Sequence, residues 1–245
     1  MKITFAPDKD RLIYISFKAT PFFITAGIIL LKQRNSFLNQ PIAPYIYTKI
    51  VRMKRITVFC GSSFGTEKIF EDQAYALGKA LAAQNIGVVY GGAKVGLMGA
   101  VANGALDNKG EVIGVLPNFL QSKEIAHEGL TELFLVETMH ERKTKMNELS
   151  DGVITLPGGF GTLEEFFEML TWAQLGLHKK PIALLNCNGF YDELLQLIET
   201  MVKKGFLKEV NQQMLISSDN IKDLIQKMQE YKAPSVGKWI TKEEL

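Results

Sequence analysis

The chain has 245 residues, of which 47% are hydrophobic and 22% are charged, a composition typical of a globular protein and not of a disordered or fibrous one. Its 28 basic and 26 acidic residues are mixed along the sequence, so no basic field indicates a nucleic-acid partner. Cys60 and Cys187 form no C-x-x-C pair, which favours a reducing, cytoplasmic location, and His127, His140 and His178 lack metal-ligand spacing, so a zinc site has no support.

Residues 1–52 differ in character from the rest of the chain. The uncharged stretch between Lys18 and Lys32 spans thirteen residues, whereas a membrane-spanning helix needs about 20. Asp8 and Asp10 are unlike the basic leader of a signal peptide. We therefore interpret residues 1–52 as an N-terminal extension, weakly ordered or non-native, and expect no membrane partner; membrane attachment is the alternative.

From Met53 onward, short β-branched runs alternate with amphipathic helical patterns. This alternation predicts an α/β fold, a Rossmann-like, doubly wound parallel sheet of about seven strands with helices on both faces, in a single domain over residues 53–232. Residues 233–245 are expected to form a C-terminal tail. Strands are predicted at 56–60, 87–90, 112–115, 133–136, 153–156, 182–185 and 215–216. Helices are predicted at 67–84, 96–108, 140–149, 163–175, 191–203 and 221–231.

Glycine-rich junctions follow the first, second and fifth predicted strands, at residues 60–63, 91–96 and 157–162. In a parallel sheet these junctions lie at the same edge, where ligands bind. Glycines let the main chain approach a ligand, and a helix start offers unpaired N–H groups, so this edge suits a phosphate. No junction matches a dinucleotide fingerprint or a P-loop, which disfavours nicotinamide chemistry and ATP hydrolysis.

The third junction combines a phosphate site with an acid/base group. Thr162 can donate a hydroxyl, and Glu165 adds a carboxylate near the start of the helix. The alternative interpretation is structural, because Thr162-x-x-Glu165 also has the spacing of a capping box.

Arg142 and Lys143 lie near the start of another predicted helix, where the helix dipole disfavours cations. An anion at the strand ends would explain them, since Arg142 can make a two-pronged contact with a phosphate or a carboxylate. The alternative is that both charges are solvated beside a capping box formed by Thr138 and Glu141.

Residues 92–99, 139–143, 157–165 and 171–176 together resemble the LONELY GUY (LOG) family of cytokinin riboside 5′-monophosphate phosphoribohydrolases. The similarity runs from about Met53 to about Tyr231. It implies hydrolysis of the N-glycosidic bond of a nucleoside 5′-monophosphate, such as AMP or isopentenyl-adenosine monophosphate, with release of an adenine-type base and ribose 5-phosphate. No metal or redox cofactor is implied, and the resemblance also suggests a homodimer.

By resemblance, Arg142 and Glu165 are the catalytic pair. Glu165 would stabilise positive charge on the ribose and orient or deprotonate water, and Arg142 would anchor the substrate and keep Glu165 ionised. Glu124 lies in a segment without the proline and arginine of the family pattern. Glu164 is expected to have a lesser role, as a surface neighbour of Glu168. The expected substrate-binding residues are Glu124, Lys143, Gly158, Gly159, Phe160, Gly161, Thr162, Leu163, Glu164, Thr171, Gly61, Ser62, Gly91, Gly92 and Met139.

Two other functions stay open at this point. One is a non-catalytic nucleotide-binding or carrier protein, because a fold and a phosphate site do not prove turnover. The other is an AMP nucleosidase with little role in cytokinin metabolism. Family members are sometimes labelled lysine decarboxylases, but Lys94 and Lys143 fit anion contacts better than a Schiff base. The apolar helical segment 166–172 offers more hydrophobic surface than one sheet face covers, which also favours a homodimer.

Overall fold

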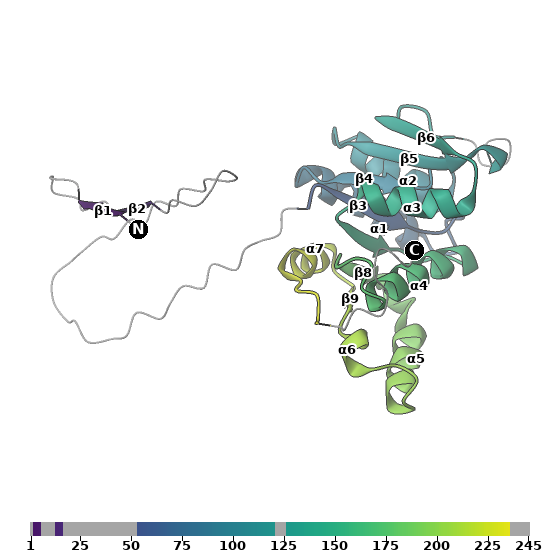
Figure 1. Cartoon of the computed structure of the whole chain (residues 1–245). Coiled ribbons are helices and arrows are strands. Elements are labelled where there is room, and N and C mark those ends of the chain that lie inside the picture. Colours follow the sequence, from purple (N-terminus) through teal and green to yellow (C-terminus); the bar gives the residue numbers. More distant parts are fainter. Residues whose placement is uncertain (1, 6–12, 17–52, 121–125, 236–245) are drawn as a thin grey trace. The chain divides into compact units, whose positions relative to one another are not determined.

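A computed structural model describes residues 2–5, 13–16, 53–120 and 126–235 (Figure 1). The chain divides into two units, residues 1–47 and 48–245. In the first unit, β1 (Lys2–Phe5) pairs antiparallel with β2 (Ile13–Ser16). The sequence analysis did not predict these strands, because it interpreted residues 1–52 as an N-terminal extension and assigned no elements there.

The second unit contains a seven-stranded sheet in the order β6-β5-β4-β3-β7-β8-β9, and every neighbouring pair is parallel. The predicted doubly wound fold is therefore confirmed. Each predicted strand is present, with small shifts at some ends. The strands are β3 (Arg55–Phe59), β4 (Gly87–Tyr90), β5 (Val112–Pro117), β6 (Glu132–Val136), β7 (Gly152–Thr155), β8 (Ile182–Leu185) and β9 (Leu215–Ser218).

The six predicted helices are also present, and short elements were missed. The α-helices are α1 (Lys68–Ala83), α2 (Gly96–Leu106), α3 (Met139–Leu149), α4 (Phe160–Gln174), α5 (Asp192–Lys203), α6 (Glu209–Gln212) and α7 (Ile221–Glu230). Short 3-10 turns occur at η1 (Asn118–Leu120) and η2 (Cys187–Gly189). The missed elements, α6, η1 and η2, have four residues or fewer and carry no helical period.

The helices cover both faces of the sheet because the strands are apolar on both sides. In β4, Val88 and Tyr90 belong to one buried cluster with side chains of α1, α2 and α7, whereas Val89 belongs to the opposite cluster with side chains of α3 and α4. Figure 1 shows α3 in front of the sheet and α2 behind it. These two packed layers fix the strands, and a site at the strand ends can rest on them.

The chain changes direction at β3, which pairs with both β4 and β7. From β3 the chain runs outward to β6, and it returns to β7 on the other side of β3. At such a switch point the connections after the two strands, here β3 and β7, lead to helices on opposite faces of the sheet and leave a crevice for ligands between them. Here the Gly61 N–H donates to the carbonyl of Pro157 over 3.0 Å, which joins the loops after β3 and β7.

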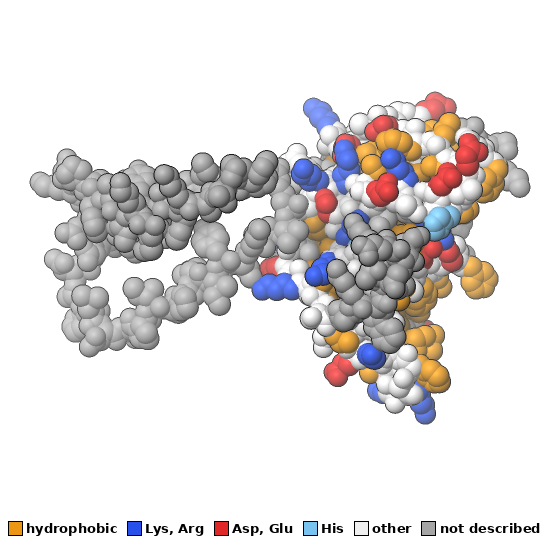
Figure 2. Space-filling view, in the orientation of Figure 1, with side chains coloured by type: hydrophobic (Ala, Val, Ile, Leu, Met, Phe, Trp, Pro, Cys, Tyr) orange, Lys and Arg blue, Asp and Glu red, His pale blue; other side chains and the backbone are white. Residues whose placement is uncertain are grey.

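The surface carries both signs of charge. Figure 2 shows Lys and Arg interspersed with Asp and Glu on the visible face of the described residues, as the mixing of basic and acidic residues along the sequence leads one to expect. No helix in the described part of the chain is long and apolar enough to cross a membrane.

Candidate active site

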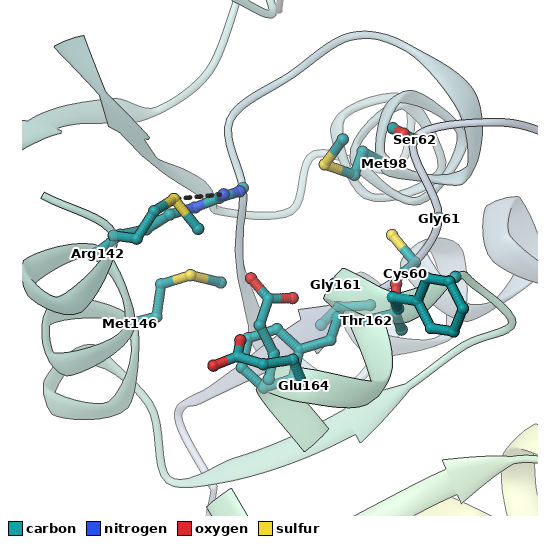
Figure 3. Close-up of a pocket in the computed structure, with 16 residues that line it drawn as sticks. Cys60, Gly61, Ser62, Met98, Arg142, Met146, Gly161, Thr162 and Glu164 are labelled. Atoms are coloured by element: carbon teal, nitrogen blue, oxygen red, sulfur yellow. Dashed lines mark hydrogen bonds between the residues drawn. The ribbon is translucent and has the colours of Figure 1, made fainter. Parts of the chain in front are cut away.

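A cavity of about 340 Å³ opens at the switch point, between the end of β3, the start of α4 and one side of α3 (Figure 3). The predicted site residues that line it are Gly61, Ser62, Gly91, Met139, Arg142, Gly159, Phe160, Gly161, Thr162, Glu164 and Glu165. Lys143, Gly158, Gly92, Leu163 and Thr171 are not in the lining. Glu124 lies outside the described residues.

Helix α4 begins at Phe160, earlier than predicted, and its N-cap is Gly159. The alternative in which Thr162 caps this helix is therefore wrong, because Thr162 lies within the first turn. The first turn carries no acidic residue, and the N-cap makes no side-chain hydrogen bond. The N–H groups of a first turn have no partner inside the helix, so this helix start is suited to an anion.

Glycines keep the main chain at the start of α4 accessible and let the loop before it pack closely against the loop after β3. A methyl group on Gly159 or Gly161 would meet no atom within 4 Å, so the main chain there is open. A methyl group on Gly158 would lie 2.1 Å from Thr162 Oγ1 and 2.8 Å from the Gly61 amide nitrogen. Gly158 thus lets the loop after β7 pack against the loop after β3, and it shapes the cavity from outside its lining.

Arg142 reaches the cavity from α3. The helix is capped by Thr138, whose Oγ1 accepts the Glu141 N–H over 3.1 Å, while Glu141 Oε2 accepts the Glu137 N–H over 2.9 Å. The capping motif is real, but the solvated interpretation of the two cations is wrong: Arg142 and Lys143 are both buried.

The guanidinium of Arg142 is held by three neighbours. Its Nε donates to the carbonyl oxygen of Val115 over 3.1 Å, and its Nη1 lies 3.9 Å from Met139 Sδ, the contact dashed in Figure 3. A methyl group on Gly91 would lie 2.0 Å from Arg142 Nη2. Gly91 therefore provides the space in which the guanidinium lies against the main chain.

Glu165 and Arg142 line the same cavity. Both act on the thiol of Cys60, which is also in the lining: burial raises the pKa of Cys60, Glu165 raises it further, and Arg142 lowers it. The two charged groups thus lie on the same side of the molecule. The Cys60 thiol stays protonated at neutral pH, so it is a poor nucleophile.

Lys143 forms ion pairs with two carboxylates of α4. Its Nζ lies 2.6 Å from Glu164 Oε1 and 3.0 Å from Glu168 Oε1. Burial by itself would lower the pKa of Lys143, but the two carboxylates outweigh burial and raise it. Glu164 and Glu168, expected to be surface neighbours, are therefore joined through this ammonium.

Other expected site residues have structural contacts. The hydroxyl of Thr171 donates to the carbonyl of Phe167 over 2.7 Å and faces a separate apolar hollow between α4, α5 and β9. Leu163 packs against the cluster under α3 and α4. Gly92 has φ of +84°, which favours glycine, and approaches the side chains of Leu116 and Leu133.

Four lining residues were missed by the sequence analysis: Val58, Phe59, Met98 and Met146; Cys60 was placed in the first glycine-rich junction but not among the site residues. The four missed residues are apolar residues within or next to predicted elements, where their types indicate only a core. Figure 3 places Met146 below Arg142 and Met98 beside Ser62, so sulfur-containing side chains form part of the wall. Among the residues that the structure describes, no group of three or more His, Cys, Asp or Glu side chains could hold a metal ion.

Comparison with known proteins identifies similar sequences over most of the chain. A family model described as "Possible lysine decarboxylase" matches residues 98–228. A probable cytokinin riboside 5′-monophosphate phosphoribohydrolase of Oryza sativa subsp. japonica is 47% identical over 180 residues, which cover 74% of each chain. A cytokinin riboside 5′-monophosphate phosphoribohydrolase of Arabidopsis thaliana is 44% identical over 180 residues, covering 74% of this chain and 84% of its own.

Solved structures show the same fold at lower identity. The molybdenum cofactor carrier protein of Chlamydomonas reinhardtii matches with a TM-score of 0.56 and 20% identity, covering 73% of this chain and 98% of its own. A molybdenum cofactor binding protein of Rippkaea orientalis matches with a TM-score of 0.54 and 24% identity, covering 72% of this chain and 95% of its own. At these identities the likeness concerns the fold alone.

Proposed function

Because the chain belongs to the LONELY GUY (LOG) family, we propose that it hydrolyses the N-glycosidic bond of nucleoside 5′-monophosphates and releases an adenine-type base and ribose 5-phosphate. The observation that carries this proposal is that Arg142, Glu165 and the open start of α4 line one cavity. A cation, a carboxylate and amide donors are the groups that this reaction needs around a sugar phosphate.

The start of α4 is the proposed site of the 5′-phosphate. Gly159, Gly161 and Thr162 line the cavity there, and Gly61 and Ser62 approach from the loop after β3. The volume of about 340 Å³ falls in the range of roughly 300–1,000 Å³ that is usual for small-molecule sites. Binding energy from the phosphate would position the sugar.

Glu165 is the proposed catalytic carboxylate. As the C1′–N bond breaks, its electron pair leaves with the base, and positive charge develops on the ribose, which a carboxylate stabilises. The oxygen of a water molecule then bonds to C1′, and Glu165 accepts the proton that this water loses. The leaving base takes up a proton from solvent.

Arg142 is the proposed anchor for the ribose or the phosphate. Its Nε is engaged by the Val115 carbonyl, which fixes the plane of the guanidinium, while its Nη2 lies against Gly91 in the cavity wall. A cation in this position also favours the ionised form of Glu165. Both effects require Arg142 to stay buried and oriented, as it is here.

A lysine decarboxylase activity, as the family model's description suggests, is not supported by the site. A Schiff-base lysine must lose its proton to attack a carbonyl. No lysine lines the cavity in the described part of the chain, and the raised pKa of Lys143 keeps that side chain charged. We expect the absorbance spectrum of the purified protein to lack a pyridoxal phosphate band near the visible range.

The proposed activity is tested by incubating the full chain with AMP and with isopentenyl-adenosine monophosphate and separating the products by chromatography. We expect free base from both, and adenosine, which lacks the phosphate, should be a poor substrate. Turnover of AMP alone would favour the AMP nucleosidase role. Tight binding of monophosphates without release of base would favour a non-catalytic nucleotide-binding protein and contradict the proposal.

We also propose that the protein acts as a homodimer. Phe160, at the start of α4, is 94% exposed, and Phe206, after α5, is 88% exposed, so apolar side chains are left uncovered in a single copy. Light scattering coupled to size-exclusion chromatography should give the mass of two chains. A mass of one chain would contradict this part of the proposal.

The proposed location is the cytoplasm. Cys60 and Cys187 are both unpaired and buried, which fits a compartment that keeps thiols reduced. A fluorescent fusion of the full chain should therefore distribute through the cytoplasm, and accumulation at a membrane or in the medium would contradict it.

A further inference from the structure

Helices α3 and α4 each carry two successive charged residues beside the cavity. Arg142 and Lys143 follow each other on α3, and Glu164 and Glu165 follow each other on α4. Arg142 and Glu165 line the cavity, whereas Lys143 is not in its lining and bridges Glu164 and Glu168. The pair proposed for catalysis therefore lies next to a cation–carboxylate cluster formed by Lys143, Glu164 and Glu168, named here the Lys143 cluster.

The Lys143 cluster joins α3 to α4 through two ion pairs. One ammonium contacts carboxylates at 2.6 Å and 3.0 Å that are four residues, or about one helical turn, apart on α4. Two contacts along one helix restrain both its rotation and its sliding against α3. Glu165 stands between Glu164 and Glu168 in the sequence, so the same contacts restrain its backbone.

The cluster also balances charge beside the cavity. The side chain of Lys143 is 10% exposed, and that of Glu168 is 21% exposed. Glu168 Oε2 is buried and has no hydrogen-bond partner in the described part of the chain, so Lys143 is the cation that compensates this carboxylate. Glu168, three residues after Glu165, lies on the same side of α4, and Glu164 directly precedes Glu165 in the chain; without Lys143 their negative charges would disfavour the ionised form of Glu165.

We propose, on the basis of the proposed function, that Lys143 is a positioning residue: its ion pairs with Glu164 and Glu168 hold α4 so that Glu165 faces Arg142 across the cavity. Lys143 then acts through Glu165 and makes no contact with the substrate. This differs from the role that the family resemblance implies, in which Lys143 binds the substrate directly.

The two roles predict different kinetics for Lys143→Met in the full chain with AMP as substrate. A positioning role predicts that kcat falls about 10- to 100-fold, because a misplaced catalytic group slows the chemical step, while KM changes less than about threefold. Lys143→Arg, which keeps a cation able to contact both carboxylates, should recover most of the lost kcat. Lys145→Met on the same helix is the matched control. Lys145 Nζ lies 4.7 Å from the centre of the Phe134 ring, and Lys145 is not in the cavity lining. This substitution should therefore leave both kcat and KM unchanged.

The pH dependence of kcat gives a readout that a merely structural role would not change. Arg142 from α3 and Cys60, which follows β3, line the cavity together with Glu165, and the Lys143 cluster includes two carboxylates of the helix that carries Glu165. Loss of the Lys143 charge leaves two uncompensated carboxylates beside Glu165, which raises its pKa. The acid limb of the profile should move to higher pH in Lys143→Met, by about one unit or less. Lys143→Met/Glu168→Gln, which removes one of these carboxylates, should show a smaller shift.

A higher KM with unchanged kcat in Lys143→Met would overturn the proposal and favour substrate binding by Lys143. Unchanged kcat and an unchanged acid limb would also overturn it. If Lys143→Met does not fold, the double variant with Glu168→Gln carries the same kinetic test, since it buries no uncompensated carboxylate.

Failure of the proposed function is distinguishable from failure of this inference. If the wild-type chain releases no base from any monophosphate, the proposed function fails. Carbon-13 NMR titration of the Glu165 carboxyl in the wild type and in Lys143→Met then still tests the inference, because the higher pKa expected in the variant does not depend on turnover. Equal pKa values in the two proteins would overturn it.

Discussion

Glu165 shares one cavity with Arg142, and its carboxylate is the group that the proposed chemistry needs most. Glu165→Gln keeps the size of the side chain but removes the charge, so we expect kcat to fall by roughly 10²–10⁴-fold. The melting temperature should change little. Base release from AMP, followed by chromatography, measures the effect.

Glu193→Gln on α5 is the matched control for this substitution. Glu193 is exposed in the first turn of that helix and is not in the cavity lining, so its loss should leave turnover unchanged. Wild-type turnover in Glu165→Gln would refute the assignment of Glu165.

At position 91, the absence of a side chain makes room for Arg142. A methyl group there would lie 2.0 Å from Arg142 Nη2 and 3.0 Å from Met98 Sδ, both of which are ends of flexible side chains. Gly91→Ala should therefore displace the guanidinium and lower kcat/KM by about tenfold or more, with little loss of stability. Steady-state kinetics and thermal unfolding together check this expectation.

A double-mutant cycle shows whether Gly91 acts through Arg142. If it does, Gly91→Ala should add little to the loss caused by Arg142→Ala. Independent, additive losses would contradict this explanation.

At the scale of elements, α1 and α2 pack through glycines that cannot accept a side chain. A methyl group on Gly78 would lie 2.1 Å from the Val101 carbonyl oxygen, and one on Gly104 would lie 2.0 Å from the Tyr75 carbonyl oxygen. Because backbone atoms cannot move aside as side chains do, Gly78→Ala should lower the free energy of unfolding by about 1–3 kcal/mol despite the higher helix propensity of alanine.

Urea denaturation measures this change in the free energy of unfolding. Lys79→Ala is the control because Lys79 is exposed on the same helix, and it should be nearly neutral. A Gly78→Ala protein as stable as the wild type would show that the two helices can separate at little cost.

The connection between α4 and β8 contains a histidine that should make stability depend on pH. Burial, and then the charge of Lys180, lowers the pKa of His178 from 6.5 to about 4. Its Nδ1 accepts the Lys180 N–H over 3.3 Å, and the backbone of Met169 opposes the shift by favouring the charged ring, but burial and Lys180 outweigh it.

The sign of the effect follows from where the proton binds. Between pH 6.5 and about 4 the unfolded chain binds a proton at His178 that the folded chain does not. The stabilisation is therefore fully present above pH 6.5 and is lost as the pH falls toward 4, by at most about 3 kcal/mol. Denaturation at several pH values should show a flatter dependence in His178→Gln, whereas His140→Gln, at an exposed site, should match the wild type.

At the scale of the whole molecule, we propose that residues 53–232 form the catalytic domain and that residues 1–52 are dispensable for turnover. The described site residues all belong to the unit of residues 48–245, and the similarity to the plant relatives covers 74% of the chain. A chain that begins at Met53 should keep kcat and KM within about twofold of the full chain. Loss of activity in a folded truncated protein would show that the N-terminal segment contributes to the site.

The sequence by itself determined the architecture, because its information is local and periodic. Alternating β-branched runs and helical patterns indicate a parallel sheet with two covered faces, and the observed order of strands confirms it. The glycine-rich junctions at the ends of β3, β4 and β7 also indicate one edge for a ligand, since carboxyl ends of parallel strands lie together.

The tertiary structure alone decided which of two neighbouring cations faces the cavity. Arg142 and Lys143 are adjacent in the sequence, yet Arg142 lines the cavity and Lys143 binds Glu164 and Glu168. The direction of each side chain depends on how α3 packs against α4, and that packing is set by side chains far apart in the chain. For the same reason Met98 and Met146 carry no sequence signal that separates a cavity wall from a buried core.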